Sequence, residues 1–218
     1  MKVGVVKETL PGERRVALVP DTVSKLIAAK LEVAIQAGAG SEAFYDDDAY
    51  QKAGGTLVPE ARAVLSQADA VLKVQPPSQD EIGALKSGAI LISFLQPSAH
   101  ADVVKALAAQ KVTAFSLELV PRISRAQSMD ALSSQAGVAG YKAVLIAANR
   151  LGKFFPLLIT AAGTVTPSRV LVLGAGVAGL QAIATARRLG AVVEAYDVRP
   201  AVKDEVKSLG ASFVELPV

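Results

Sequence analysis

The feature that most constrains the fold of this chain is a regular alternation of two kinds of segment. Short runs rich in β-branched residues alternate with longer amphipathic stretches of helical length. Parallel strands need a long crossover between them, and a helix commonly supplies it. The alternation is therefore typical of parallel sheets covered by helices, and the sequence predicts an α/β protein.

The first half of the chain predicts a complete doubly wound sheet. Several of its helical stretches begin with Pro or Asp in the first turn, where these residues favour helix initiation. We expect strands at residues 3–6, 32–36, 70–74, 89–94 and 112–117, and helices near residues 20–30, 47–53, 59–67, 78–86 and 99–110. Five strands with intervening helices predict a flavodoxin-like N-terminal domain over residues 1–135.

The second half predicts a connecting helix followed by part of a second α/β domain. A long helix is expected over residues 133–151, and the nucleotide-binding domain is assigned, with this connector, to residues 136–218. Three strands form only the first half of a Rossmann sheet, and an open parallel edge is an aggregation liability. We therefore expect the Rossmann domain to be incomplete at Val218, as in an N-terminal fragment or a sheet completed by another chain. The expected elements are strands 170–173, 192–196 and 212–216 and helices 177–189 and 201–209.

The composition excludes several classes of function. The chain has no Cys and one His, which excludes thiolate chemistry and a polyhistidine metal site within one chain. Its 23 Lys and Arg are interleaved with 20 Asp and Glu and there is no Trp, so we expect no nucleic-acid partner. The longest apolar stretch, residues 154–165, is about half the length that spans a bilayer and contains Pro156 and Gly163, so no direct membrane span is expected. The sequence begins with a predicted strand, so we expect no signal peptide.

A glycine-rich turn is the most specific chemical motif. Residues 171–179 form a predicted strand that continues into G-x-G-x-x-G and then a helix. Gly174 permits a tight turn, Gly176 lets the backbone approach a pyrophosphate, and Gly179 allows the helix and strand to pack closely. The amides and dipole at the helix start, near Val177, would hold the phosphates. A turn that serves packing alone is the alternative.

An acidic residue lies where such folds recognise a ribose. Asp197 is eighteen residues past Gly179, at the end of the next predicted strand, and Val198 and Arg199 follow it. An acid there can accept hydrogen bonds from the adenosine ribose hydroxyls and would repel a 2′-phosphate, which predicts NAD(H) over NADP(H). Arg199 weakens this inference, because an arginine near this point can accommodate the phosphate.

A polar segment precedes the long predicted helix. Residues 121–135 follow a strand and contain two Arg, two Gln, one Asp and four Ser. Segments after the C-terminal ends of strands are where α/β sheets bind ligands. A solvated loop in which Ser133 or Ser134 caps the helix is an equally good interpretation of these residues. The composition leaves both open.

This segment, with residues 137–141 (Gly-Val-Ala-Gly-Tyr) and 155–164 (Phe-Pro-Leu-Leu-Ile-Thr-Ala-Ala-Gly-Thr) beyond it, resembles domain I of the proton-translocating NAD(P) transhydrogenase α subunit. The resemblance covers the whole chain. It implies an enzyme that transfers hydride from NADH to NADP⁺, coupled to proton translocation, with this chain binding NAD(H). It also implies a homodimer, an NADP(H)-binding domain and membrane proton-channel subunits as partners. The implied location is cytoplasmic, peripheral to the inner membrane through those subunits.

The resemblance also implies the site. In that family an Arg, a Gln, an Asp and a Ser of the loop hold the nicotinamide end of NAD(H), and they map onto Arg122, Gln127, Asp130 and Ser133. Hydride transfer between two nicotinamides needs orientation and exclusion of water more than acid–base groups. Arg122 would meet the carboxamide or a phosphate, Gln127 would bridge toward the second nucleotide, and Asp130 and Ser133 would fix the carboxamide and the loop. The full set assigned to cofactor binding is Arg122, Ile123, Ser124, Arg125, Gln127, Asp130, Ser133, Gly174, Gly176, Val177, Gly179, Asp197, Val198 and Arg199.

The opening segment, residues 5–20, is shared in pattern with alanine dehydrogenase, which has the same two-domain plan. In that relative an Arg matching Arg15 and a Lys matching Lys73 bind the substrate carboxylate, and a catalytic His corresponds to Gln96. An amide cannot serve as the general acid or base of imine formation. We therefore keep an alanine dehydrogenase-like amino-acid dehydrogenase as the alternative, and a non-catalytic NAD-sensing module as a third. Arg15 and Lys73 are interpreted as structural charges or a vestigial anion site, and His100 as a capping or surface residue.

Overall fold

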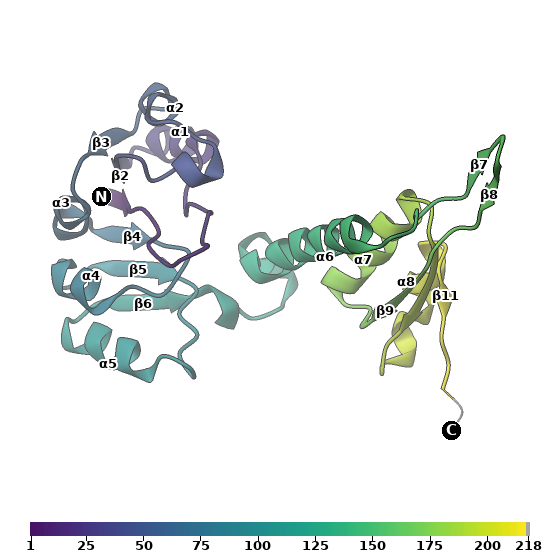
Figure 1. Cartoon of the computed structure of the whole chain (residues 1–218). Helices are drawn as coiled ribbons and strands as arrows, with labels where there is room; N and C mark the ends of the chain where they lie inside the picture. The colour runs from purple at the N-terminus through teal and green to yellow at the C-terminus, as the bar shows by residue number, and fades with distance from the viewer. Residues whose placement is uncertain (217–218) are drawn as a thin grey trace. The chain divides into compact units, whose positions relative to one another are not determined.

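The structure, a computed structural model, describes residues 1–216. The chain divides into two compact units, of which the first comprises Met1–Met129 and the second begins at Asp130 (Figure 1). The predicted boundary at residue 135 falls inside the long helix α6 (Ala131–Arg150), which opens the second unit. Residue 218, where we expected the second domain to be incomplete, lies outside the described residues.

The first unit is built on a parallel sheet of six strands in the order β3-β2-β1-β4-β5-β6. Its strands are β1 (Lys2–Val5), β2 (Glu32–Gln36), β3 (Thr56–Val58), β4 (Ala70–Leu72), β5 (Ile90–Ser93) and β6 (Thr113–Ser116). The five predicted strands are confirmed, and without β3 they follow the flavodoxin-like order. Strand β3, a three-residue strand at the edge beside β2, was not predicted from the sequence.

Five helices cover this sheet, each close to a predicted stretch. They are α1 (Pro20–Ala28), α2 (Asp47–Lys52), α3 (Ala61–Gln67), α4 (Gln79–Ala84) and α5 (Ala101–Ala109). Side-chain caps fix two of their starts. Asp46 accepts a hydrogen bond from the Ala49 amide before α2, and Ser78 and Glu81 form a reciprocal capping box at α4.

The sheet buries apolar side chains on both faces, as a doubly wound fold requires. Successive residues of a strand point to opposite faces, so Ala34 and Ile35 of β2 belong to different core clusters. One cluster packs α3, α4 and α5 against the sheet, and the other packs α1 and α2. Folds of this kind place their ligand sites at the C-terminal ends of the parallel strands.

The second unit contains a three-stranded parallel sheet in the order β11-β10-β9. Its strands are β9 (Arg169–Leu173), β10 (Val192–Tyr196) and β11 (Ser212–Phe213), and after α6 its helices are α7 (Val177–Arg188) and α8 (Lys203–Ser208). The predicted strand at 212–216 ends at Phe213, three residues early. An antiparallel hairpin, β7 (Leu158–Thr160) with β8 (Gly163–Val165), lies in a segment where no strand was predicted.

Helices α6 and α7 pack very closely in this unit. A Cβ atom added to Gly140 of α6 would lie 2.1 Å from the carbonyl oxygen of Ala178 in α7. Val144 of α6 and Ile183 of α7 then join Val193 of β10 in one buried cluster. A glycine at this crossing therefore sets the distance between the two helices.

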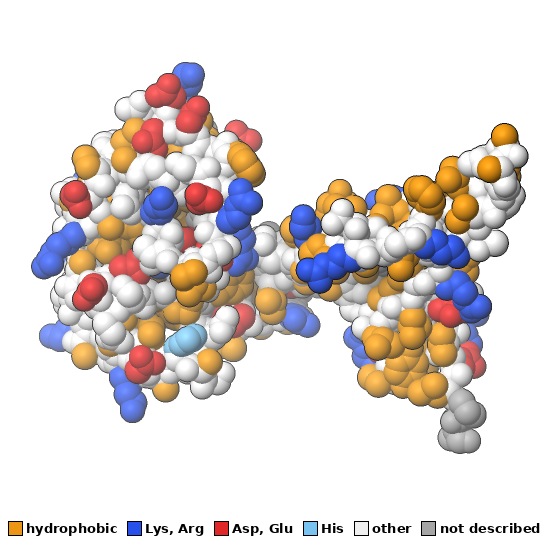
Figure 2. All heavy atoms as spheres, in the orientation of Figure 1, with side chains coloured by type: hydrophobic (Ala, Val, Ile, Leu, Met, Phe, Trp, Pro, Cys, Tyr) orange, Lys and Arg blue, Asp and Glu red, His pale blue; other side chains and the backbone are white. Residues whose placement is uncertain are grey.

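The outer face of β9 is apolar and exposed. Val170 and Val172 pack against the core of the unit, whereas Leu171 and Leu173 are 56% and 75% exposed. Figure 2 shows hydrophobic side chains gathered over this sheet. Among the described residues β9 pairs with β10 alone. Within residues 1–216, no helix has both the length and the apolarity that crossing a bilayer demands.

Candidate nucleotide-binding site

The glycine-rich turn has the predicted strand–turn–helix context. It begins where β9 ends at Leu173 and leads into α7 at Val177. Gly174 has a φ of +96°, in the left-handed region that L side chains rarely adopt. A Cβ added to Gly179 would lie 1.7 Å from the carbonyl oxygen of Gly174. The first and third glycines are therefore required by the turn and by its contact with the helix.

The start of α7 is open to an anion. Gly176 precedes the helix and has no side chain to cap it. A Cβ added there would meet no described atom within 4 Å, and Val177 is 50% exposed. The first N–H groups of a helix have no intrahelical acceptor, and the helix dipole favours negative charge beside them. This arrangement suits a phosphate group.

Asp197, the acid predicted to bind a ribose, lies next to the glycine-rich turn. Gly174 donates its N–H to the carbonyl of Tyr196, the last residue of β10, at 2.8 Å. The Asp197 carboxylate accepts a hydrogen bond from the Ala175 N–H at 2.7 Å, and its side chain is only 6% exposed. Arg199 donates its backbone N–H at 2.8 Å, its Nε at 2.9 Å and its Nη2 at 3.0 Å to the same carboxylate. These donors, the Arg199 guanidinium first, hold the pKa of Asp197 well below its usual range.

The structure thus brings seven of the predicted residues together at the C-terminal ends of β9 and β10. Val198 is 80% exposed beside them, and the Arg199 side chain is 58% exposed. The seven residues are Gly174, Gly176, Val177, Gly179, Asp197, Val198 and Arg199.

The polar loop at the end of the first unit forms a short 3₁₀ helix, Ser124–Met129. Ala126 is its one buried residue in the described segment, while Ile123 is 55% exposed. Within residues 1–216, the side chains of Arg122, Arg125 and Gln127 make no hydrogen bond or ion pair. The loop therefore presents two cations and an amide to solvent.

Asp130, rather than Ser133 or Ser134, caps the long helix. Its carboxylate accepts hydrogen bonds from the Ser133 N–H at 2.8 Å and from the Ser133 hydroxyl at 2.6 Å. The alternative in which Ser133 or Ser134 caps the helix is therefore wrong, because the helix begins at Ala131, two residues before the predicted start. Asp130 and Ser133, two residues of the predicted nicotinamide group, are thus hydrogen-bonded to each other in the second unit.

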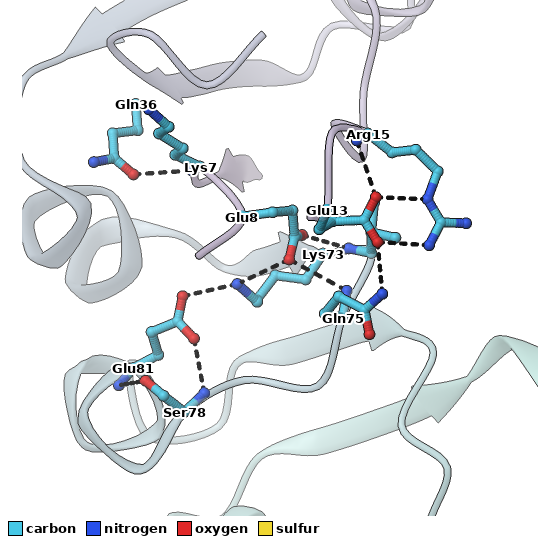
Figure 3. Close-up of polar contacts among 10 residues, drawn as sticks. Lys7, Glu8, Glu13, Arg15, Gln36, Lys73, Gln75, Ser78 and Glu81 are labelled. Atoms are coloured by element: carbon cyan, nitrogen blue, oxygen red, sulfur yellow. Dashed lines mark hydrogen bonds and ion pairs between the residues drawn. The ribbon is translucent and has the colours of Figure 1, made fainter. Parts of the chain in front are cut away.

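A second candidate site lies in the first unit. A cavity of about 510 Å³ opens at the C-terminal ends of β1, β4 and β5. Figure 3 shows the polar contacts of Glu8, Lys73 and Glu81. The Lys73 ammonium is buried there, 2.7 Å from Glu81 and 3.6 Å from Glu8. Glu8 also accepts the N–H of Val74 at 2.6 Å. The lining residues are Glu8, Thr9, Leu10, Pro11, Lys73, Gln75, Pro76, Pro77, Ser78, Gln96, His100 and Val103.

Both cations predicted to bind a carboxylate in an alanine dehydrogenase are paired within the chain. Arg15 donates its Nε and Nη2 to Glu13 at 2.7 and 2.6 Å, and Gln75 donates to the same carboxylate at 2.6 Å. The hydrogen bond from Arg15, helped by Gln75 and opposed by burial, lowers the pKa of Glu13 to about 2. With Lys73 between two glutamates, this geometry supports the interpretation of Arg15 and Lys73 as structural charges.

Gln96 and His100 both line this cavity. Gln96 has a φ of +46°, which is strained for a residue other than glycine, and Glu118 accepts its backbone N–H. His100 occupies the N-cap position of α5, but its side chain makes no capping bond within the described chain. Glu8, Glu81 and Glu118 were not predicted as members of a site. The three-residue spacing of Ser78 and Glu81 is typical of a capping box, and it could have identified Glu81.

A doubly wound first unit followed by a dinucleotide-type turn defines a class of two-domain α/β nucleotide-binding proteins. Residues 4–139 match the family model "Alanine dehydrogenase/PNT, N-terminal domain", and residues 143–217 match "Alanine dehydrogenase/PNT, C-terminal domain". The chain belongs to the alanine dehydrogenase/PNT family.

Its relatives include proteins of both kinds. The chain is 52% identical to an NAD(P) transhydrogenase subunit alpha polypeptide of Rhodospirillum rubrum, over 98% of its own length and 57% of that protein. It is 35% identical to alanine dehydrogenase of Mycobacterium tuberculosis, over 98% of this chain and 57% of the dehydrogenase. The resemblance to transhydrogenase α subunits is confirmed, and the chain spans under two thirds of these relatives.

A solved structure has the same fold. The transhydrogenase from Sinorhizobium meliloti superposes with a TM-score of 0.96 at 48% identity, over 99% of this chain and 64% of that one. The match covers both units, so the predicted fold class is confirmed.

Proposed function

We propose that this chain is the NAD(H)-binding component of a proton-translocating NAD(P) transhydrogenase, which transfers hydride between NADH and NADP⁺. The observation that carries the proposal is the glycine turn joined to Asp197 through the Ala175 N–H. The 52% identity to a transhydrogenase α subunit supports this activity over the dehydrogenase one.

In this function the residues of the second unit bind the adenosine end of the dinucleotide. The open start of α7, at Gly176 and Val177, binds the pyrophosphate. Asp197 accepts the hydroxyl groups of the adenosine ribose, and the exposed Val198 offers an apolar contact beside it. A 2′-phosphate would bring negative charge next to this carboxylate, so the site selects NAD(H).

The nicotinamide end is assigned to the polar loop and the start of α6. Arg122 and Gln127 are exposed and unengaged within the described chain, so both can contact a nucleotide without breaking an existing bond. Ile123, Ser124 and Arg125 belong to the same loop, and the Asp130–Ser133 pair fixes its end. The nicotinamide supplies the hydride, so these residues orient and shield it rather than exchange protons.

The partners follow from the same proposal. NADP(H) is carried by a separate domain, and proton translocation by membrane subunits of the same complex. The chain works as a homodimer in the cytoplasm, at the inner membrane through those subunits. The subunit names of its relatives support an assembly of several chains.

An alanine dehydrogenase-like activity is less well supported by the first-unit cavity. Gln96 lines it, and an amide can neither donate nor accept the proton that imine chemistry requires. The cations that would bind a substrate carboxylate, Lys73 and Arg15, are already paired with glutamates.

Nucleotide binding tests the proposal. The full-length protein should bind NADH in preference to NADPH, as measured by the fluorescence of the reduced nicotinamide. Asp197→Ala should weaken NADH binding, with Asp204→Ala as a control on an exposed acid of α8. A folded protein that binds neither nucleotide would refute the proposal, and equal binding by Asp197→Ala would refute the ribose role.

A further inference from the structure

Arg199 donates hydrogen bonds to both oxygens of the Asp197 carboxylate. Oδ1 accepts the backbone N–H and the Nε of Arg199, and Oδ2 accepts the Ala175 N–H and the Nη2 of Arg199. Three of the four donors come from Arg199. Asp197 and Arg199, which both follow β10, are therefore closely paired.

The guanidinium of Arg199 is committed to this acid. Within the described chain its ion pair is with Asp197, through two parallel N–H donors. An arginine can offer the same planar pair of donors to a phosphate, and it is the side chain best suited to do so. The next cation along the chain, Lys203, is likewise held by a carboxylate, that of Glu215. The first two positive charges after β10 are thus both paired with carboxylates.

We propose that Asp197 and Arg199 form a single selectivity element, in which Asp197 withholds Arg199 from the 2′-phosphate of NADP(H). The inference rests on the proposed function and names a residue that determines its nucleotide specificity. Asp197 then acts in two ways. Its charge repels the 2′-phosphate, and its hydrogen bonds occupy the cation that would otherwise bind that phosphate. Neutralising Asp197 turns Arg199 into a phosphate ligand.

The paired element and an acid that acts by repulsion alone predict different effects of substitution on nucleotide preference. If Asp197 worked by repulsion only, its replacement would relax the preference for NADH, whatever residue stood at position 199. With the paired element, the gain in NADPH affinity depends on the Arg199 guanidinium. Removing Arg199 alone leaves the repelling carboxylate in place, so the preference for NADH persists.

Dissociation constants of NADH and NADPH for the full-length protein separate these cases. The variants are Asp197→Asn, Arg199→Ala and the double variant, and Arg169→Ala is the control. Arg169 also forms an exposed ion pair, 2.5 Å from Glu194, at the opposite end of β9. Asp197→Asn should bind NADPH about tenfold more tightly than the unmodified protein, as a charge-assisted hydrogen bond allows. The double variant should lose that gain, and Arg169→Ala should match the unmodified protein.

Equal NADPH affinity of Asp197→Asn and the double variant would overturn the inference, as would the absence of any gain in Asp197→Asn. If Asp197→Asn fails to fold by circular dichroism, Asp197→Ser replaces it, because a hydroxyl keeps an acceptor for the Ala175 N–H. An unmodified protein that is folded yet binds no NADH would refute the proposed function itself. If the unmodified protein binds NADH but all variants have the same NADPH affinity, the selectivity element would be refuted and the proposed function would stand.

Discussion

The carboxylate of Asp197 accepts a hydrogen bond from the backbone N–H of Ala175 at 2.7 Å. This bond joins the end of β10 to the glycine turn after β9, although all of α7 lies between them in the sequence. A change at the acid therefore reaches the phosphate-binding turn, and the two features of the nucleotide site are structurally coupled.

Gly176→Ala should separate nucleotide binding from folding. The added methyl group meets no described atom within 4 Å, so the free energy of unfolding should stay the same. It would, however, stand where the pyrophosphate approaches the backbone, and NADH affinity should fall by at least about tenfold, or about 1.4 kcal/mol. Titration of NADH and urea unfolding measure the two quantities. Gly152→Ala, also without a described neighbour, is the control, and an unchanged affinity in Gly176→Ala would contradict the assignment.

Lys73→Met should destabilise the first unit. It removes the cation between Glu8 and Glu81 and leaves uncompensated carboxylates in a buried site. The cost should be about 3 kcal/mol or more in the free energy of unfolding, measured with urea. Lys86→Met is the matched control, because its pair with Asp69 is half exposed and should contribute little. Equal effects of the two variants would show that the buried ion pairs do not stabilise the fold.

Gly140→Ala should push α6 and α7 apart. Its Cβ would lie 2.1 Å from the Ala178 carbonyl oxygen, so the helices must move, at a cost of about 1–3 kcal/mol. Gly137→Ala, on the same helix, meets no described atom within 4 Å and should instead stabilise α6 by up to about 1 kcal/mol. Thermal unfolding of both variants gives the comparison. A stabilised Gly140→Ala variant would rule out the close helix contact.

Glu13 should make stability depend on pH in the acid range. Its pKa falls from the usual 4.5 to about 2 in the folded chain, chiefly because Arg15 donates to it. A lowered folded pKa stabilises the protein above pH 4.5, and this contribution disappears as the pH falls toward 2. The difference in unfolding free energy between the unmodified protein and Glu13→Gln should shrink over that window. A difference that does not vary with pH would contradict the role of the Arg15 contact.

Much of the fold was predictable from hydrophobic periodicity. The central strands of the first unit's sheet, β1, β2, β4 and β5, are apolar and largely buried, so the apolar runs around Ile35 and Leu91 identified them. Strand β3 and the β7–β8 hairpin were missed because their three-residue strands are too short to establish a period and, unlike the equally short β4, are not buried.

Some features of the candidate site could likewise be predicted from the sequence, and others could not. The glycine turn was predictable because Gly174 and Gly179 are required by local backbone geometry. The pairing of Lys73 with Glu8 and Glu81 was not, because it depends on which strand ends meet at the sheet edge. The cap at Asp130 was missed because Ser133 and Ser134 are also good capping residues, so the sequence did not distinguish among the three.

The most direct test of the proposed function is hydride transfer from NADH to NADP⁺ by the full-length protein assembled with an NADP(H)-binding partner. We expect transfer, and we expect Arg122→Ala and Gln127→Ala to lower its rate at saturating NADH far more than they weaken NADH binding. Lys142→Ala, an exposed residue of α6, is the control. Absence of transfer by the assembled complex would contradict the proposed function. Equal losses of rate and binding in both loop variants would contradict the positioning role of Arg122 and Gln127.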